Sequence, residues 1–189
     1  MDIRNPIASN GGDWQIRFGE TWKAQADKLS AKFSHNIEKI EMPAKNLTDV
    51  PIVFIKKESL IELLHYLKTE NGFEYGFLSD ITATDESPND PRFEIIYQLF
   101  CQQKHIRIRV KTKVRENETC PTATVIWPAA NWAEREIWDM FGIKFLGHPD
   151  LRRILMDPRW EGHPLRKDYP LRGYQVFTTP IPPEEKYLK

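Results

Sequence analysis

Two histidines and two carboxylates in the last third of the chain are residue types that bind metal ions: His148, Asp150, Glu161 and His163. Each histidine directly precedes a proline, which favours an extended backbone, and the spacing differs from that of two histidines on one helix face. We therefore expect the imidazole nitrogens to bond to backbone or carboxylate groups of the chain itself. A free-standing metal-dependent hydrolase that uses His148 and His163 is the alternative.

Glu134 and Glu136 form a second candidate site, because paired carboxylates can serve as general acid and general base. Side chains that are two residues apart on a helix point about 200° away from each other, so these two carboxylates would not face one substrate. We expect them instead to bond to neighbouring arginines and to anchor the helix that carries them. Arg135 and Asp139 lie four positions apart and are expected to pair.

Sequence motifs for other chemistries are absent. The chain has no GxSxG nucleophile motif, no GxGxxG nucleotide loop and no phosphate loop of the GxxxxGKS or GxxxxGKT type. Cys101 and Cys120 are the only cysteines and lie too far apart for a zinc or iron–sulfur motif, so we expect free thiols. The sequence thus predicts no catalytic, cofactor-binding or metal-binding residue in this chain.

The composition is that of an ordinary soluble globular chain. The 189 residues include 27 Lys and Arg against 27 Asp and Glu, so the formal net charge is zero, and 40% are hydrophobic. A groove that neutralises many phosphates usually shows in the net charge, so we expect no nucleic-acid partner. The sequence has no apolar run near the roughly 20 residues of a membrane span, and no signal or transit peptide is recognisable, so we expect membrane contact only through partners.

Apolar periodicity predicts an α+β domain over residues 1–128. Helical spacing over residues 20–34 and over Glu58–Thr69 indicates two helices. Five strands are expected, at Ile37–Ile40, Ile52–Ile55, Phe73–Thr84, Phe93–Phe100 and His105–Val114, with turns at 85–91 and 102–104. Together they predict a mixed or antiparallel sheet with helices on one face.

Basic residues alternate with apolar ones along the last expected strand. They are Arg107, Arg109, Lys111 and Lys113. This alternation is typical of a sheet that is buried on one face only. We expect a solvated face or an edge protected by charge, and a binding surface is the alternative.

Residues 129–189 are expected to form one helix followed by an extended arm. Asn131 is the expected N-cap of the helix and Gly142 its C-terminal stop. Of the 14 prolines, nine lie at or after Pro121, and neither a helical nor a strand period follows Ile143. Aromatic side chains in the arm need a surface to pack on, so we expect the arm to lie across a partner protein; they include Trp160, Tyr169, Tyr174, Phe177 and Tyr187.

Three stretches of this segment resemble a known family. Glu134–Gly142 holds Glu-Arg-Glu with an aspartate three residues on, Gly147–Leu155 begins Gly-His-Pro-Asp, and Gly162–Leu171 begins Gly-His-Pro-Leu-Arg-Lys-Asp. In order and spacing they are similar to the C subunit of NADH-quinone oxidoreductase, the NADH dehydrogenase 30 kDa subunit family of respiratory complex I. The resemblance covers about residues 128–172.

The resemblance implies a non-catalytic structural and assembly subunit in the peripheral arm of a complex that transfers electrons from NADH to quinone and translocates protons. Other subunits would hold FMN, the iron–sulfur clusters and quinone. The implied partners are the D subunit, which is similar to the large subunit of nickel–iron hydrogenases, and other hydrophilic subunits. The implied place is the cytoplasmic side of a bacterial inner membrane. The equivalent subunit of a membrane-bound hydrogenase or a related complex I-like oxidoreductase is the alternative.

The charged and aromatic residues of these stretches are the expected partner interface, because forked Arg donors and aromatic rings are typical of protein interfaces. They are Glu134, Arg135, Glu136, Asp139, His148, Arg152, Arg153, Trp160, His163, Arg166, Lys167, Asp168 and Tyr169.

Overall fold

The computed structural model describes residues 13–43, 50–172 and 175, and side chains from residue 19 onward. Its helices are α1 (Asp13–Lys32), the short 3-10 helix η1 (Lys57–Ser59), α2 (Leu60–Thr69) and α3 (Ala130–Phe141). Its strands are β1 (Ile37–Glu41), β2 (Ile52–Ile55), β3 (Phe77–Asp85), β4 (Phe93–Cys101), β5 (Ile106–Val114), β6 (Thr119–Pro121) and β7 (Lys144–Leu146).

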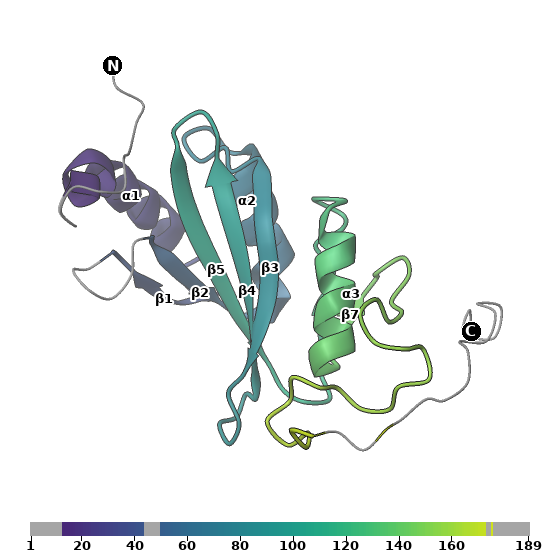
Figure 1. Cartoon of the computed structure of the whole chain (residues 1–189). Helices are drawn as coiled ribbons and strands as arrows, with labels where there is room; N and C mark the ends of the chain where they lie inside the picture. Colours follow the sequence, from purple (N-terminus) through teal and green to yellow (C-terminus); the bar gives the residue numbers. More distant parts are fainter. Residues whose placement is uncertain (1–12, 44–49, 173–174, 176–189) are drawn as a thin grey trace.

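A five-stranded mixed sheet in the order β1-β2-β5-β4-β3 forms the centre of the molecule (Figure 1). β2 and β5 are parallel, whereas the other neighbouring pairs are antiparallel. β6 and β7 form a separate two-stranded parallel sheet. Long alternating runs such as β5 explain the sheet, because period-two alternation places every second side chain on one face.

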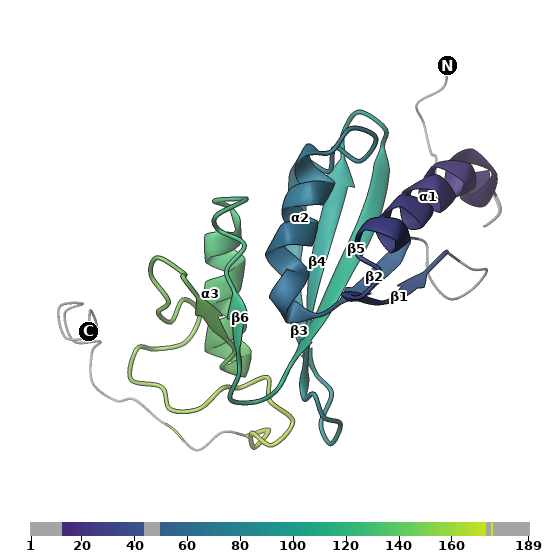
Figure 2. The same ribbon diagram turned by 180° about the vertical axis from the view of Figure 1, so that it is seen from behind.

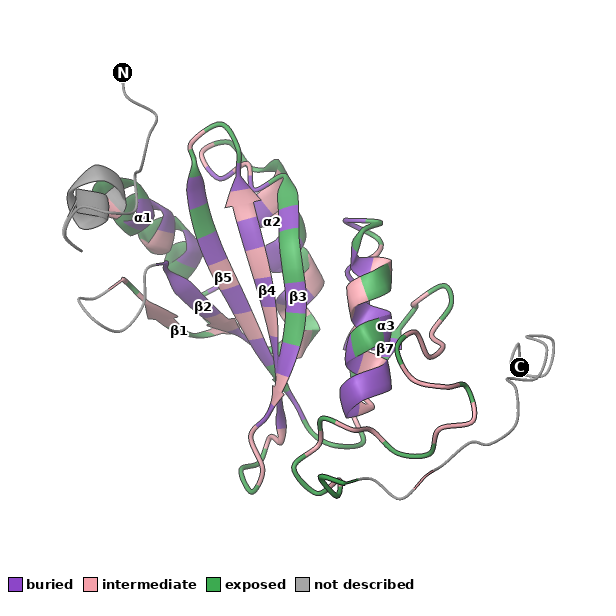
Figure 3. Ribbon diagram, in the orientation of Figure 1, coloured by how far each residue is buried: buried purple, intermediate pink, exposed green. Residues whose placement is uncertain are grey.

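The helices α1 and α2 cover one face of the large sheet, as the view from behind shows (Figure 2). Leu60, Leu63, Leu64 and Leu67 of α2 are all buried against that face. Buried and less buried residues alternate along the strands, as the bands on β3, β4 and β5 show (Figure 3). The hydrophobic core therefore lies between the sheet and these two helices, while the opposite face carries polar and half-buried side chains.

α3 stands beside β3, at the edge of the large sheet (Figures 1 and 2). The indole nitrogen of Trp127 donates to the Gly76 carbonyl at 2.9 Å, and the Lys68 ammonium donates to the Ile126 carbonyl at 2.7 Å. Buried residues of α3 and β7 belong to the same apolar cluster as the sheet core. This cluster includes residues on both sides of the expected boundary between residues 128 and 129. The division of the chain into the two parts 1–128 and 129–189 stays a prediction.

The expected α+β class, with a mixed sheet and helices on one face, is confirmed, although several boundaries differ. Residues before β3 form a turn rather than strand, because the Tyr75 amide bonds to the Leu67 carbonyl at the end of α2. α3 starts at Ala130 with Ala129 as N-cap, so the expected cap at Asn131 is wrong. The expected stop at Gly142 is confirmed, because this residue adopts the left-handed conformation at the C-cap.

The arm is expected from residue 143 onward, and the structure describes it to residue 172 and at 175. The strand β7 lies at the start of the arm and was not expected from the sequence. Its partner β6 lies 25 positions earlier in the chain, with Thr119 opposite Lys144, so no local pattern indicates this pairing. Tyr174, Phe177 and Tyr187 lie outside the described residues. No helix of the described part is both long and apolar enough to cross a membrane.

Candidate interaction surface

The Glu134 carboxylate lies fully buried on α3, facing the loop that follows β6. It accepts hydrogen bonds from the Thr122 hydroxyl at 2.5 Å and from the Ala123 amide at 2.6 Å. Burial raises the pKa of Glu134 to about 7, against the lowering effect of these two bonds. The expected bond to an arginine is wrong for Glu134, because its two oxygens are bonded to the loop, and Glu136 points to solvent.

The Asp139 carboxylate organises the next loop. It is fully buried and accepts bonds from three consecutive backbone amides, those of Ile154, Leu155 and Met156, at 2.8–3.0 Å. The Arg153 guanidinium donates to its other oxygen at 2.6 Å. Burial alone would raise the pKa of Asp139, but these donors outweigh it and hold the pKa below its ordinary value. Asp139 therefore stays ionised and fixes the loop after Arg153.

Arg135 also binds this loop, from the same helix. Its guanidinium donates to the carbonyls of Arg152 and Arg153 at 3.1 and 3.0 Å and lies 5.2 Å from the ring centre of Trp132. The expected pairing of Arg135 with Asp139 is therefore wrong, because each has its bonds to residues 152–156 instead.

Three carbonyls at the C-terminal end of α3 accept hydrogen bonds from the arm. The His163 ring nitrogen Nδ1 donates to the Asp139 carbonyl at 3.0 Å, and the Leu165 amide donates to the Met140 carbonyl at 3.0 Å. The Arg166 guanidinium donates to the Phe141 carbonyl at 2.6 Å. The last carbonyls of a helix lack partners within the helix, so the arm satisfies them and a cation lies at the negative end of the helix dipole.

Gly142 makes this close approach possible. Its φ of +79° lies in the left-handed region, and a Cβ atom there would come within 2.5 Å of both the Arg166 guanidinium and the His163 ring. Burial lowers the pKa of His163, so the imidazole is favoured in its neutral form. In that form Nδ1 carries the proton, because the carbonyl can only accept.

The arm reaches the base of the large sheet through its Arg-Lys-Asp sequence. The Lys167 amide donates to the Asp85 carboxylate at 2.9 Å, and Asp168 accepts from the Arg92 guanidinium at 2.8 and 3.1 Å. Arg92 also binds Asp85 at 2.8 Å and Glu116 at 3.1 Å. The hydrogen bond from Arg92 is the largest cause that lowers the pKa of Asp85 far below its ordinary value.

The remaining predicted interface residues lie along the arm. The His148 ring bonds to the Asn131 carbonyl at 3.1 Å and accepts from the Asp150 amide at 3.0 Å. Asp150 pairs with Arg152 at 2.9 Å. The Trp160 and Tyr169 rings lie 6.3 Å apart and are half-buried.

The expectation that both histidines bond to groups of the chain is confirmed. One ring nitrogen of each histidine is hydrogen-bonded to a backbone carbonyl, of Asn131 for His148 and of Asp139 for His163. His148 and His163 bind different residues of α3 and do not converge. Within the part of the chain that the structure describes, no three His, Cys, Asp or Glu side chains are grouped so as to hold a metal ion. Cys101 and Cys120 are buried free thiols, and burial raises the pKa of Cys120 to about 12.

Exposed apolar side chains gather on residues 125–172, which we call the α3–arm segment. Of the eight large hydrophobic side chains that are exposed in the described part, six belong to it: Val125, Trp132, Leu146, Leu155, Leu165 and Leu171. Single exposed apolar side chains are common on protein surfaces, but six of them on one segment make that segment the candidate contact surface. The geometry therefore describes a rigidly anchored segment with apolar side chains on its outside.

Comparison with known proteins shows which family the chain belongs to. The model of the family described as "Respiratory-chain NADH dehydrogenase, 30 Kd subunit" matches residues 53–175. The chain belongs to this family. The match begins in β2 and extends through the α3–arm segment, so it covers the large sheet except β1, together with the anchored arm.

Related proteins from distant organisms are similar to this chain over about two thirds of its length or more. The NADH-quinone oxidoreductase C 2 subunit of Rhizobium meliloti (strain 1021) is 46% identical over 127 residues, which are 67% of this chain and 70% of the relative. The NADH-quinone oxidoreductase C subunit of Geotalea uraniireducens (strain Rf4) is 43% identical over 147 residues, 77% of this chain and 86% of the relative. The mitochondrial NADH-ubiquinone oxidoreductase 30.4 kDa subunit of Neurospora crassa is 46% identical over 122 residues, 65% of this chain and 43% of the relative.

Several residues that hold the α3–arm segment were not among the predicted site residues. They are Asp85, Arg92, Glu116 and Thr122, and each lies before α3 in the sequence. The sequence predicts only a turn at Asp85, and nothing in its neighbours indicates a bond to a residue 82 positions away. The one local signal is Arg92, directly after the turn, because a cation there favours an ion pair with a nearby carboxylate such as that of Asp85.

Proposed function

We propose that this chain is a non-catalytic structural and assembly subunit in the peripheral arm of NADH-quinone oxidoreductase. It supports electron transfer from NADH to quinone, coupled to proton translocation, without binding FMN, an iron–sulfur cluster or quinone itself. Membership of the 30 kDa subunit family supports the complex, since its members are named as subunits of that oxidoreductase. The α3–arm segment supports the structural role, because it presents exposed apolar side chains on a hydrogen-bonded frame.

The observation that carries the proposal is that exposed apolar side chains belong to residues whose backbone is hydrogen-bonded to α3. Leu155 is 61% exposed although its own amide is bonded to the buried Asp139, and Leu165 is 55% exposed although its amide caps α3. A segment whose backbone is already ordered has less conformational entropy to lose when a partner covers it. The α3–arm segment is therefore prepared for binding before the partner arrives.

The partner is the D subunit of the oxidoreductase, together with other hydrophilic subunits, at the cytoplasmic side of a bacterial inner membrane. Of the thirteen predicted interface residues, Glu136, Lys167 and Asp168 are exposed and can reach it directly. Glu134 and Asp139 are fully buried, so they act by positioning the loops that the partner meets. The other predicted interface residues lie between these two extremes.

The test replaces two exposed leucines by glutamate, Leu155→Glu with Leu165→Glu, in the full-length chain expressed in its own cells. Complexes are purified from native membranes, and the subunits that co-purify are identified. We expect recovery of the other subunits to fall about tenfold, since charge in an apolar interface is poorly tolerated. The matched control is Met42→Glu, an exposed apolar side chain outside the α3–arm segment.

The stability of the isolated chain separates assembly from folding. Exposed substitutions usually change the free energy of unfolding by less than about 0.5 kcal/mol, so the double variant should unfold like the parent chain. Normal recovery of the complex with the double variant would contradict the interface. Co-purification with hydrogenase subunits, and without a flavin-binding NADH subunit, would replace the proposed complex by the membrane-bound hydrogenase alternative.

A further inference from the structure

One face of the large sheet is not covered by any helix of the described part. α1 and α2 lie on the other face, and α3 stands at the β3 edge (Figures 1 and 2). We call this uncovered side the open face and define it by six side chains that the strand register places on it: Phe77, Ile96, Phe100, Arg107, Arg109 and Lys113. None of these six side chains takes part in the hydrogen bonds described above that anchor the α3–arm segment.

Aromatic rings and cations alternate on the open face. Phe77, Phe100 and Arg107 are direct partners across β3, β4 and β5, and the Arg107 guanidinium lies 5.2 Å from the Phe100 ring centre. Phe77 is 49% exposed, which is unusual for a phenylalanine in a long paired strand. A third ring, Phe54 of the neighbouring strand β2, has the Lys111 ammonium 5.5 Å from its centre. Arg107 and Lys111 therefore lie over the rings of Phe100 and Phe54, whereas Phe77 keeps about half of its surface exposed.

The open face also carries two carboxylates, Glu94 of β4 and the exposed Asp80 of β3, so its positive charge is partly balanced within the chain. Lys111 is paired with Glu94 at 2.6 Å, but Arg109 is bonded to the neutral amide of Gln98 at 3.2 Å. Arg107 and Lys113 are exposed, and neither has an ion pair with a residue that the structure describes. The open face thus offers three cations and two half-exposed rings to a partner, near the exposed carboxylate of Asp80.

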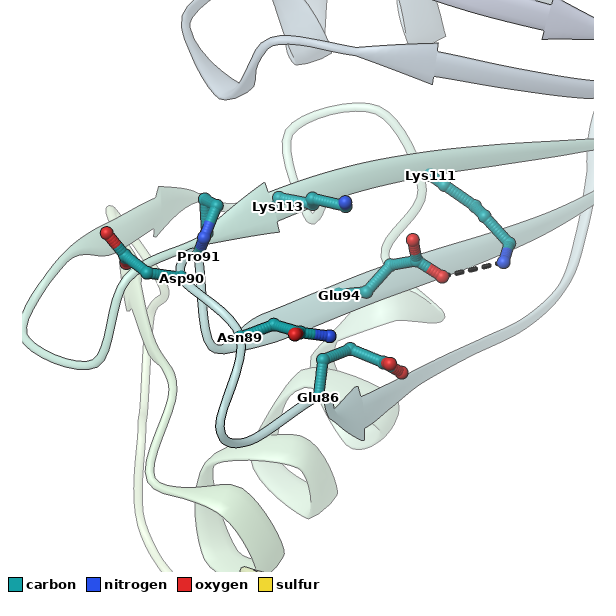
Figure 4. A pocket seen from close by; sticks show the side chains of 7 residues that line it. All are labelled: Glu86, Asn89, Asp90, Pro91, Glu94, Lys111 and Lys113. Atoms are coloured by element: carbon teal, nitrogen blue, oxygen red, sulfur yellow. Dashed lines mark hydrogen bonds and ion pairs between the residues drawn. The ribbon is translucent and has the colours of Figure 1, made fainter.

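A polar hollow of about 480 Å³ lies at one end of the open face, between the β3–β4 loop and the adjoining ends of β4 and β5 (Figure 4). Figure 4 shows that Lys113 reaches towards it, with Glu94 turned to Lys111. Glu86 and Asp90 line the same hollow. This mixture of charges selects no single ion, so the hollow marks the limit of the basic surface and is not itself a ligand site.

We propose that the open face is a second docking surface, which binds an acidic segment of another protein. An apolar side chain of that segment packs on Phe77 and Phe100, and its carboxylates reach Arg107 and Arg109. Forked guanidinium donors favour carboxylates, and cations beside aromatic rings are typical of protein interfaces. A protein is favoured over a nucleic acid because three cations neutralise few phosphates and the chain has no net charge.

The test places a photo-reactive benzoyl-phenylalanine at position 77 of the full-length chain in its own cells. After irradiation the tagged chain is purified and the cross-linked peptide is sequenced. A second chain carries the same group at His65, which is exposed on α2 on the covered side of the sheet. We expect position 77, and not position 65, to cross-link to a segment of another protein that is rich in Asp and Glu.

Charge reversal then tests the chemistry of recognition. In the chain that carries Arg107→Glu and Arg109→Glu, the yield of this cross-link should fall about tenfold, whereas the lysine variants of both residues should retain most of it. The double variant is first shown to unfold at the temperature of the parent chain. A basic or apolar cross-linked segment, a cross-link to nucleic acid, an unchanged yield, or no cross-link from position 77 would each overturn the proposal.

The open face and the α3–arm segment are tested by separate readouts. The subunits that co-purify with the chain decide whether it assembles into NADH-quinone oxidoreductase, whereas the sequence of the cross-linked segment decides what covers the open face. A normal complex without a cross-link from position 77 would remove only the second docking surface.

Discussion

Asp85 and Lys167 lie 82 positions apart in the sequence and are joined by a hydrogen bond of 2.9 Å, from the Lys167 amide to the Asp85 carboxylate. Asp85 ends β3, and Lys167 follows the arm residues that cap α3. Arg92 binds the same carboxylate and also Asp168, so one guanidinium joins the sheet to the arm. The arm is thus held at the helix end and at the base of the sheet.

The first prediction concerns Asp85→Asn. The substitution removes the charge that Arg92 and the Lys167 amide share, and hydrogen bonds to charged groups contribute more than neutral ones. We expect the free energy of unfolding to fall by about 2 kcal/mol at neutral pH, measured by urea unfolding. Asp80→Asn, an exposed aspartate on the same strand, is the control and should change little.

The pH dependence of this effect has a definite sign. The pKa of Asp85 is lowered in the folded chain, so its contribution is present above the ordinary pKa of an aspartate and is lost as the pH falls. The difference in stability between the parent chain and Asp85→Asn should therefore shrink below about pH 4. A difference that stays constant in acid would contradict the ionised pair.

The second prediction concerns Gly142→Ala. The left-handed backbone disfavours any Cβ, and the added atom would meet the His163 ring and the Arg166 guanidinium at about 2.5 Å. We expect the free energy of unfolding to fall by about 2–3 kcal/mol, because backbone strain and displaced capping groups act together. Amide hydrogen exchange of Leu165 should accelerate, since its bond to the Met140 carbonyl depends on this approach.

Gly19→Ala is the matched control for this measurement. Gly19 lies in α1 and a Cβ atom there meets no other group within 4 Å. Alanine favours a helix over glycine by about 0.5–1 kcal/mol, so this variant should be slightly more stable than the parent chain. Equal destabilisation by both variants would show that the packing of the arm on α3 does not depend on the absence of a side chain at Gly142.

The third prediction concerns Asp139→Asn. The amide group that replaces the carboxylate can accept at one atom only, whereas Asp139 receives three backbone amides and the Arg153 guanidinium. We expect a loss of about 3 kcal/mol, since removing one member of a buried pair leaves the other uncompensated. Exchange of the Ile154 and Leu155 amides should accelerate. Glu136→Gln, an exposed carboxylate on the same helix, should alter neither quantity.

The sequence could predict the elements of the sheet because each has its own period. The alternation along β5 and the leucine spacing of α2 are local signals, and both elements form where they were expected. The Gly142 stop is equally local. Boundaries that depend on distant bonds were missed, such as the turn before β3 that the Leu67 carbonyl fixes through the Tyr75 amide.

The candidate site could be located from the sequence but its contacts could not. The stretch from Glu134 to Asp139 was recognised, yet the pairing of Arg135 with Asp139 was inferred from helical spacing alone. In the folded chain the arm offers Asp139 three amides and a guanidinium, which together outcompete a neighbour on the same helix. Likewise, Asp85 and Arg92 became part of the site only through the path of the arm.

The fourth prediction concerns the buried carboxyl of Glu134. Its pKa is raised to about 7, mainly by burial. Burial is also the main cause that raises the pKa values of the neighbouring Tyr97 and Cys120, and the Glu134 charge adds to it. A carboxyl whose pKa is higher in the folded chain binds its proton more tightly there. Its contribution to stability is therefore present at low pH and is lost as the pH rises from its ordinary pKa towards about 7.

Glu134→Gln keeps the shape of the side chain and cannot ionise. Its oxygen can accept from the Ala123 amide and its amide group can donate to the Thr122 hydroxyl, which bonds onward to Thr124. We expect the parent chain to lose about 2 kcal/mol relative to this variant between about pH 5.5 and about pH 8. Urea unfolding at both pH values measures the difference.

Comparing the two chains isolates Glu134 from other groups that titrate in this range. The pKa of His163 is lowered in the folded chain, so His163 reduces stability as the pH falls, which is opposite in sign to Glu134. This contribution is common to the parent chain and to Glu134→Gln, and it cancels in their difference. Glu136→Gln should follow the parent chain at both pH values, because the side chain of Glu136 is exposed. If the parent chain and Glu134→Gln have parallel pH profiles, Glu134 does not take up a proton in this range, and its carboxylate is held ionised by Thr122 and the Ala123 amide despite its burial.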